Sequence, residues 1–188
     1  MASGKHRRQK AENSDMTEIR TERLILRTMT PGDSAAVFAW AGDERVNAFM
    51  CYAVYRSEDA VREWILSVPC ETETAHELVI VQKSTGAVIG GCGIRRDEER
   101  GSWTFGYNLR FDAWGNGYAT EAVRAMLDFI ADRHAPCVFE GTVAKENAAS
   151  LRVMEKCGLS PHKETEYAKA DGSRSFKAIV FRKEVAAK

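Results

Sequence analysis

Two glycines stand just before a stretch with helical periodicity, in the sequence AWGNGYATEAVRAMLDFI at residues 113–130. The first N–H groups of a helix have no partner within it, and its N-terminus carries a partial positive charge. Because glycine has no Cβ, Gly115 and Gly117 would let a phosphate reach those N–H groups. A Walker loop needs lysine where Tyr118 stands, and the dinucleotide motif needs a third glycine where Thr120 stands. The residues alone leave a phosphate site and a plain strand-to-helix turn equally open.

A second pair of polar residues begins a later predicted helix. Asn147 and Ser150 are three residues apart, so both side chains project from the same side of its first turn. Both could bond an amide or a sulfur of a ligand. Asn147 is also a good helix N-cap, and the cap role is compatible with the ligand role.

Composition excludes several classes of function. The chain has 188 residues, enough for one domain with a sizeable core, and its 27 basic and 27 acidic residues cancel, so no affinity for DNA is expected. No apolar run reaches the roughly 20 residues that span a bilayer, and no signal peptide is visible, so no membrane association is expected. The five cysteines form no CxxC pair and the four histidines are scattered. We therefore expect no metal site and a cytoplasmic protein with reduced thiols.

The N-terminal residues differ from the rest of the chain. Residues 1–16 have no periodicity and almost no large apolar side chains, so we interpret them as a disordered tail and 17–188 as a single domain. The basic cluster KHRRQK at 5–10 could contact RNA or another acidic surface, although a solvated leader is the simpler interpretation.

The remaining elements must position the two polar motifs. Helical periodicity predicts helices from about 31 to 41, 43 to 49, 57 to 68, 118 to 130 and 147 to 157, and alternation predicts strands at 22–29, 76–82, 87–96, 102–110, 137–144, 162–170 and 173–184. Short turns join the three strands between 76 and 110, which indicates an antiparallel meander. This order predicts an α/β (α+β) fold with one mixed, mostly antiparallel sheet of about seven strands and helices on both faces.

Three segments together resemble the GNAT superfamily of acetyl-CoA-dependent N-acetyltransferases, and more closely its RimJ/RimL-like branch, which includes ribosomal-protein N-terminal acetyltransferases. They are TERLILRTMTPGD at 21–33, GYNLRFDAWGNGYATEAVRAMLDF at 106–129 and GTVAKENAASLRVMEKCGL at 141–159. Their order and spacing agree with the family, and the resemblance covers roughly residues 18–183.

The resemblance implies a role for each matching residue. The segment that matches the pyrophosphate loop of the family consists of Gly115, Asn116, Gly117, Tyr118, Ala119 and Thr120. Asn108, Leu109 and Arg110 match the strand that pairs with the pantetheine arm, and this fourth predicted strand is expected to splay from the fifth in a V-shaped slot for acetyl-CoA. Asn147 matches the asparagine that bonds the pantetheine amide, and Ser150 matches a serine near the thioester sulfur. The family leaves a homodimer open.

Two positions depart from the family pattern. Asp112 stands where a Gln or Arg often begins the pyrophosphate loop, and we expect its carboxylate to face away from a diphosphate. Many relatives outside this branch carry a tyrosine just after the asparagine–serine pair that protonates the leaving thiolate. Met154 and its neighbours supply none here, which leaves Ser150, directly or through water, as the candidate.

The other candidate catalytic residues each have a structural alternative. Tyr107 could line the slot or pack in the core beside Phe105, and Glu140, a carboxylate inside an apolar strand, either points to the slot mouth or faces solvent. His76 could be a base, although a surface histidine is favoured, and Glu121 is expected to be structural. In the family the early helical region covers the acceptor site, so one or two of its aromatic residues could line that pocket: Trp40, Phe49, Tyr52 and Tyr55.

The leading hypothesis is an N-acetyltransferase that moves the acetyl group to a primary amine, on a protein N-terminus or a small molecule, by direct transfer in a ternary complex. Holding the amine beside the thioester can supply most of the rate. The alternative is a non-catalytic module that binds or senses CoA, motivated by the missing tyrosine. A nucleotide-binding reading is disfavoured by the absent lysine.

Overall fold

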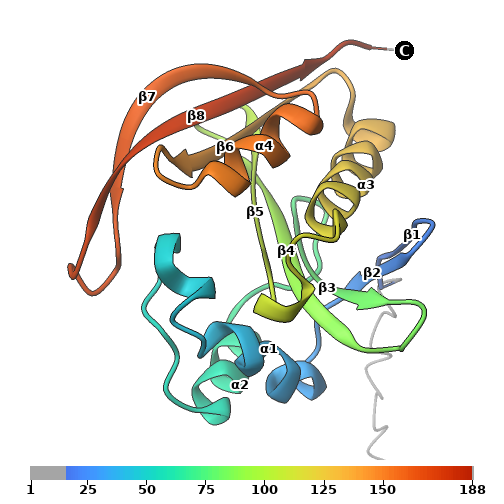
Figure 1. The fold of residues 1–188 in the computed structure, drawn as a ribbon. Coiled ribbons are helices and arrows are strands. Elements are labelled where there is room, and N and C mark those ends of the chain that lie inside the picture. The colour runs from blue at the N-terminus through green and yellow to red at the C-terminus, as the bar shows by residue number, and fades with distance from the viewer. Residues whose placement is uncertain (1–15, 188) are drawn as a thin grey trace, which may run out of the picture.

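The computed structural model describes residues 16–187. Its strands are β1 Glu18–Arg20, β2 Leu24–Thr28, β3 Ala75–Gln82, β4 Val88–Asp97, β5 Ser102–Leu109, β6 Cys137–Ala144, β7 Ser160–Ala168 and β8 Ser175–Val185. Its α-helices are α1 Ser34–Ala41, α2 Glu58–Ser67, α3 Tyr118–His134 and α4 Ala148–Lys156 (Figure 1). The tail expected at residues 1–16 lies outside the described residues except for Met16, so the domain boundary stays a prediction.

The strands form one open sheet in the order β1-β2-β3-β4-β5-β6-β8-β7. This confirms a mixed, mostly antiparallel sheet, with eight strands rather than about seven. The additional strand is β1, whose three residues are too few to show alternation in the sequence.

A splay divides the sheet between β5 and β6, the fourth and fifth strands predicted from the sequence. These two strands are parallel and pair only through Trp103 with Phe139 and Thr104 with Glu140. Beyond Thr104, β5 is bonded to β4 on one side and has no strand partner on the other. The predicted V-shaped opening is therefore present, and it exposes one backbone edge of β5 from Phe105 onward.

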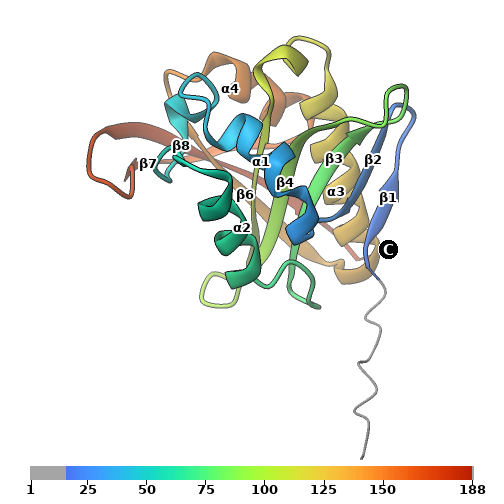
Figure 2. The same cartoon turned by 90° about the horizontal axis from the view of Figure 1, so that it is seen from below.

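Helices cover both faces of the sheet (Figures 1 and 2). Helix α3 packs on one face against β1, β2, β4, β5 and β6, whereas α1 packs against β4 on the other face and against α2. Side chains of β3 point alternately to the two faces of the sheet and contribute to a core on each face. Leu78 and Ile80 belong to the core under α3, and Val79 belongs to the core under α1 and α2.

Local signals explain where the early helices begin. Ser57 caps α2 by accepting a hydrogen bond from the Ala60 amide. Thr30 and Asp33 form a capping box, but Pro31–Asp33 make one 3₁₀ turn before α1 begins at Ser34. The helix expected at 43–49 is likewise a short 3₁₀ turn, Val46–Phe49. None of the helices described is long and apolar enough to cross a membrane.

Candidate active site

A cavity of about 1060 Å³ occupies the splay. Its walls come from the second half of β5, the glycine loop, β6 and the first turn of α4, which the sheet order brings together. The predicted site residues among its lining are Tyr107, Asn108, Leu109, Gly115, Gly117, Tyr118, Ala119, Thr120, Glu140, Asn147 and Ser150.

The glycine loop has a backbone that only glycine adopts readily. Gly115 and Gly117 have φ angles of 77° and 78°, in the left-handed region, and Gly117 is the N-cap of α3 without a capping side chain. The first turn of α3 therefore lines the cavity without a side-chain cap on its amides. Asn116 does not line the cavity, because its side-chain amide turns back to donate to the carbonyls of Ala113 and Trp114.

An arginine that the sequence did not single out fixes this loop. The Arg23 guanidinium donates to the Asn116 carbonyl at 2.9 Å and to Glu121 Oε2 at 2.7 Å, and it lies 4.7 Å from the centre of the Tyr118 ring. Burial raises the pKa of the Glu121 carboxyl, but hydrogen bonds from Thr21 and Arg23 outweigh this effect and hold that pKa below its usual value. Glu121 therefore has the structural role expected of it, as the anchor of Arg23.

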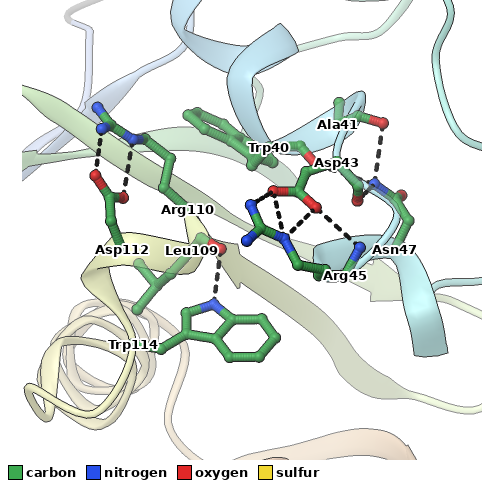
Figure 3. Close-up of polar contacts among 9 residues, drawn as sticks. All are labelled: Trp40, Ala41, Asp43, Arg45, Asn47, Leu109, Arg110, Asp112 and Trp114. Atoms are coloured by element: carbon green, nitrogen blue, oxygen red, sulfur yellow. Dashed lines mark hydrogen bonds and ion pairs between the residues drawn. The ribbon is translucent and has the colours of Figure 1, made fainter.

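The end of β5 turns its side chains in different directions. Asn108 donates to the Tyr52 hydroxyl at 2.9 Å, and the buried Leu109 offers its carbonyl to the Trp114 indole. Arg110 lies outside the cavity lining and pairs with Asp112 at 2.5 Å (Figure 3). The Asp112 carboxylate is held by this arginine, which agrees with the expectation that it faces away from the loop.

Two of the candidate catalytic residues meet across the splay. The Tyr107 hydroxyl lies 2.6 Å from Ser150 Oγ, although the two residues are 43 positions apart. Asn147 caps α4 by accepting from the Ser150 amide at 3.1 Å, so the cap reading of this pair is confirmed. Burial raises the pKa of the Tyr107 phenol to about 12, against the lowering effect of its hydrogen bond with Ser150. The phenol is therefore protonated at neutral pH and can donate to a thiolate.

Glu140 lies at the inner end of the splay, paired with Thr104. It is 6% exposed, so the solvent-facing alternative is wrong. Its carboxylate is 3.5 Å from the Ser102 hydroxyl and 3.6 Å from the Arg182 guanidinium. His76 is also buried, with Nδ1 2.7 Å from Glu71, so the expected surface histidine is wrong. In both cases a partner elsewhere in the fold satisfies the polar group.

Two exposed aromatic side chains flank the loop and were not singled out from the sequence. Trp114 is 46% exposed and Phe111 is 44% exposed, with ring centres 5.1 Å apart. The indole of Trp114 lines the cavity and is fixed by its bond to the Leu109 carbonyl (Figure 3). Arg45, held by Asp43, covers the Phe111 ring at 3.9 Å. The signal in the sequence was two aromatic residues within the four positions before Gly115.

A second cavity, of about 400 Å³, lies on the α1 and α2 side of β4 and β5. Trp40, Tyr52 and Tyr55 line it, whereas Phe49 lines the larger cavity. No cluster of His, Cys, Asp and Glu suited to a metal ion occurs among the described residues.

Comparison with known proteins identifies the class. Residues 23–160 match the acetyltransferase (GNAT) domain family, so the chain belongs to the GNAT acetyltransferases. An uncharacterized N-acetyltransferase, p20, from Bacillus licheniformis is 31% identical over 164 residues, which cover 84% of this chain and 90% of that protein. The enzyme class is accordingly N-acetyltransferase.

Solved structures share the fold at lower identity. RimL, a ribosomal L7/L12 alpha-N-protein acetyltransferase in complex with coenzyme A, has a TM-score of 0.80 at 15% identity, over 92% of this chain and 100% of that one. A spermidine N-acetyltransferase from Vibrio cholerae, in complex with CoA and spermine, has a TM-score of 0.73 at 17% identity, over 87% and 96%. These two proteins share the fold and are named for different acceptors, a ribosomal protein and spermidine, so the fold alone does not identify the acceptor.

Proposed function

We propose that the protein transfers the acetyl group of acetyl-CoA to a primary amine by direct transfer in a ternary complex, using residues 17–188 as one catalytic domain. The observation that carries the proposal is the 2.6 Å contact of Tyr107 with Ser150 inside the cavity bordered by the glycine loop. It supplies a phenol at the splay although no tyrosine stands near Met154, just after the asparagine–serine pair.

The cosubstrate would lie along three features of the cavity. The N–H groups at the start of α3, from Gly117 to Thr120, would hold the diphosphate, since a helix N-terminus with no side-chain cap favours an anion. The free edge of β5 would pair with the pantetheine arm. The Nδ2 group of Asn147 would donate to a pantetheine carbonyl, because only its Oδ1 is engaged within the described residues.

The chemistry follows from this placement. The amine lone pair forms the C–N bond, the C–S bond breaks, and its electron pair leaves on sulfur. A hydrogen bond from the Tyr107 phenol would stabilise the negative charge that develops there, and Ser150 would orient the phenol. The phenol at this position favours catalysis over a module that only binds CoA.

The Tyr107 role can be tested separately from cofactor binding. In Tyr107→Phe we expect kcat to fall by about 10- to 100-fold, because one donor to the developing charge is lost, with the Kd for acetyl-CoA within about twofold of the wild type. Thiol release with a panel of primary amines measures kcat, and calorimetry measures Kd. Ser150→Ala should also lower kcat, because the Tyr107 phenol would lose the partner that orients it.

The matched control is Ser67→Ala, which removes a hydroxyl from the exposed end of α2. An unchanged kcat in Tyr107→Phe would remove the phenol from the mechanism. Binding of acetyl-CoA without thiol release with any amine would favour the non-catalytic module.

A further inference from the structure

The two cavities share one segment of β5. Thr104 to Asn108 line both of them, so an acetyl group held at the splay would be reached from either face of the sheet. Tyr107 packs with the core on the α3 face, whereas Asn108 reaches Tyr52 on the α1 and α2 face. The smaller cavity therefore lies across β5 from the Tyr107 side chain and its partner Ser150.

The strand register connects this segment of β5, through β4, to the carboxylate of Glu77 on β3. Gly106 of β5 pairs with Gly93 of β4, and Gly93 pairs with Glu77 of β3. The Glu77 side chain leans over Gly93, because a Cβ at that glycine would meet Glu77 Oε2 at 2.2 Å. Neighbouring strands lie about 5 Å apart, so the carboxylate is roughly one strand spacing from the β5 backbone.

The Glu77 carboxylate lacks the partners that a shielded charge normally has. Its side chain is only 21% exposed, yet it accepts no hydrogen bond from any residue that the structure describes, and its ion pair with Arg95 is 3.7 Å long. Arg95 is itself half exposed. An acceptor this shielded, with one long ion pair and no hydrogen bond, is suited to a ligand that brings its own N–H groups.

We propose that Glu77 binds the ammonium group of the acceptor and removes its proton. The acceptor is then a primary amine whose ammonium is its one positive charge and is attached to an apolar or aromatic group. This inference rests on the proposed acetyl transfer. The aromatic walls of the cavity, Trp40, Tyr52, Tyr55 and Trp64, suit such a group and can add cation–π attraction. Glu77 is the one carboxylate among the described residues that line it, so the further charges of a polyamine would find no partner.

The proton balance is complete without another reactant. The ammonium gives its first proton to Glu77, which passes it to solvent, and the neutral nitrogen then attacks the thioester carbonyl. The nitrogen loses a second proton as the amide forms, and the departing thiolate takes up one proton. One proton is released in net terms for each acetyl group transferred.

The surroundings of Glu77 permit this role at neutral pH. Burial raises the pKa of the Glu77 carboxyl, and the charge of Arg95 opposes the rise. Helix α1 carries no titratable side chain, and Trp64 is the residue of α2 that lines the cavity. The thiols of Cys70 and Cys92, whose pKa values burial raises, are neutral neighbours. Burial therefore dominates the titration of Glu77, and Arg95 is the nearby charge that opposes it.

The test compares Glu77→Gln with the wild type, using 2-phenylethylamine at saturating acetyl-CoA between pH 6 and 10. We expect kcat/KM to fall by at least about 30-fold at pH 7, since a positioned base contributes about 10²- to 10⁴-fold. The loss in kcat/KM should shrink to about threefold near pH 10, where a substantial fraction of an alkylamine is already neutral in solution. Glu77→Asp should recover part of the loss, and Glu63→Gln, on the exposed face of α2, is the matched control.

A second variant reaches the same carboxylate without removing it. Gly93→Ala would push the flexible Glu77 side chain aside, so it should fold and bind acetyl-CoA normally yet lose activity at pH 7. The wild type should also prefer 2-phenylethylamine to spermidine by at least about tenfold in kcat/KM, a difference of about 1.4 kcal/mol.

The outcomes separate the two proposals. Wild-type protein that acetylates no amine would overturn the proposed function and this inference with it. An active wild type with a pH-independent deficit in Glu77→Gln, or none, would overturn the role of Glu77 alone. A preference for spermidine would overturn the proposed acceptor class alone.

Discussion

The glycine loop offers the sharpest test of cofactor binding, through the substitution Gly117→Glu. Gly117 has φ 78°, and a left-handed conformation costs a residue with a side chain about 1–2 kcal/mol. At about 2–4 °C per kcal/mol for a chain of this size, the melting temperature should fall by roughly 2–8 °C. The new carboxylate would also stand at the N-terminus of α3, where the proposed diphosphate lies.

The effect on affinity follows from the hydrogen bonds that the substitution would remove. One hydrogen bond to a charged group contributes about 1.5–3 kcal/mol. Losing one therefore weakens CoA binding by at least about tenfold, since about 1.4 kcal/mol corresponds to a factor of ten. Titration calorimetry with acetyl-CoA measures this change in Kd, and Gly117→Ala separates backbone strain from charge.

A second glycine provides the matched control. Gly86, in the turn between β3 and β4, has φ 71° and lies outside the cavity, and a Cβ at this position would meet no atom within 4 Å. Gly86→Glu should therefore lower the melting temperature by a similar amount and leave the Kd unchanged. If Gly117→Glu also kept the wild-type Kd, the loop would be a turn and the cofactor assignment would be refuted.

Two further predictions concern an exposed tryptophan and a partly buried ion pair. Trp114, at 46% exposure on the cavity wall, should change its fluorescence when CoA binds, and Trp114→Phe should abolish most of that signal while the thermal shift with CoA remains. Burial raises the pKa of Asp33, but hydrogen bonds from Arg27 and Thr30 outweigh it and lower that pKa. Because the folded-state pKa is depressed, the stabilisation is present above the unfolded pKa near 4 and is lost as pH falls through the folded value. Asp33→Asn should thus cost about 1 kcal/mol at pH 7, and this cost should shrink as the pH falls through the depressed pKa of Asp33, as measured by urea unfolding at each pH. A cost that does not change with pH would contradict this reasoning.

The sequence by itself determined the features that depend on neighbouring residues. Alternation and helical spacing located seven of the strands and all four α-helices, since these periods arise within each segment. The caps at Ser57 and Asn147 followed from side chains that reach amides three residues away. The positive φ angles of the glycine loop are equally local, because only glycine adopts them at low cost.

Tertiary structure alone decided which distant side chains meet. Tyr107 contacts Ser150, and Arg23 holds the loop at Asn116, only because the splayed sheet and the helices on its faces bring these segments together. His76 is buried, contrary to the expectation from the sequence, and its ring nitrogen has Glu71 as a partner. Glu77 could not be singled out from the sequence, because only the strand register places its side chain over Gly93. Local periodicity fixes the face on which a side chain lies, whereas its partner depends on strand order and register, which are set by long-range pairing.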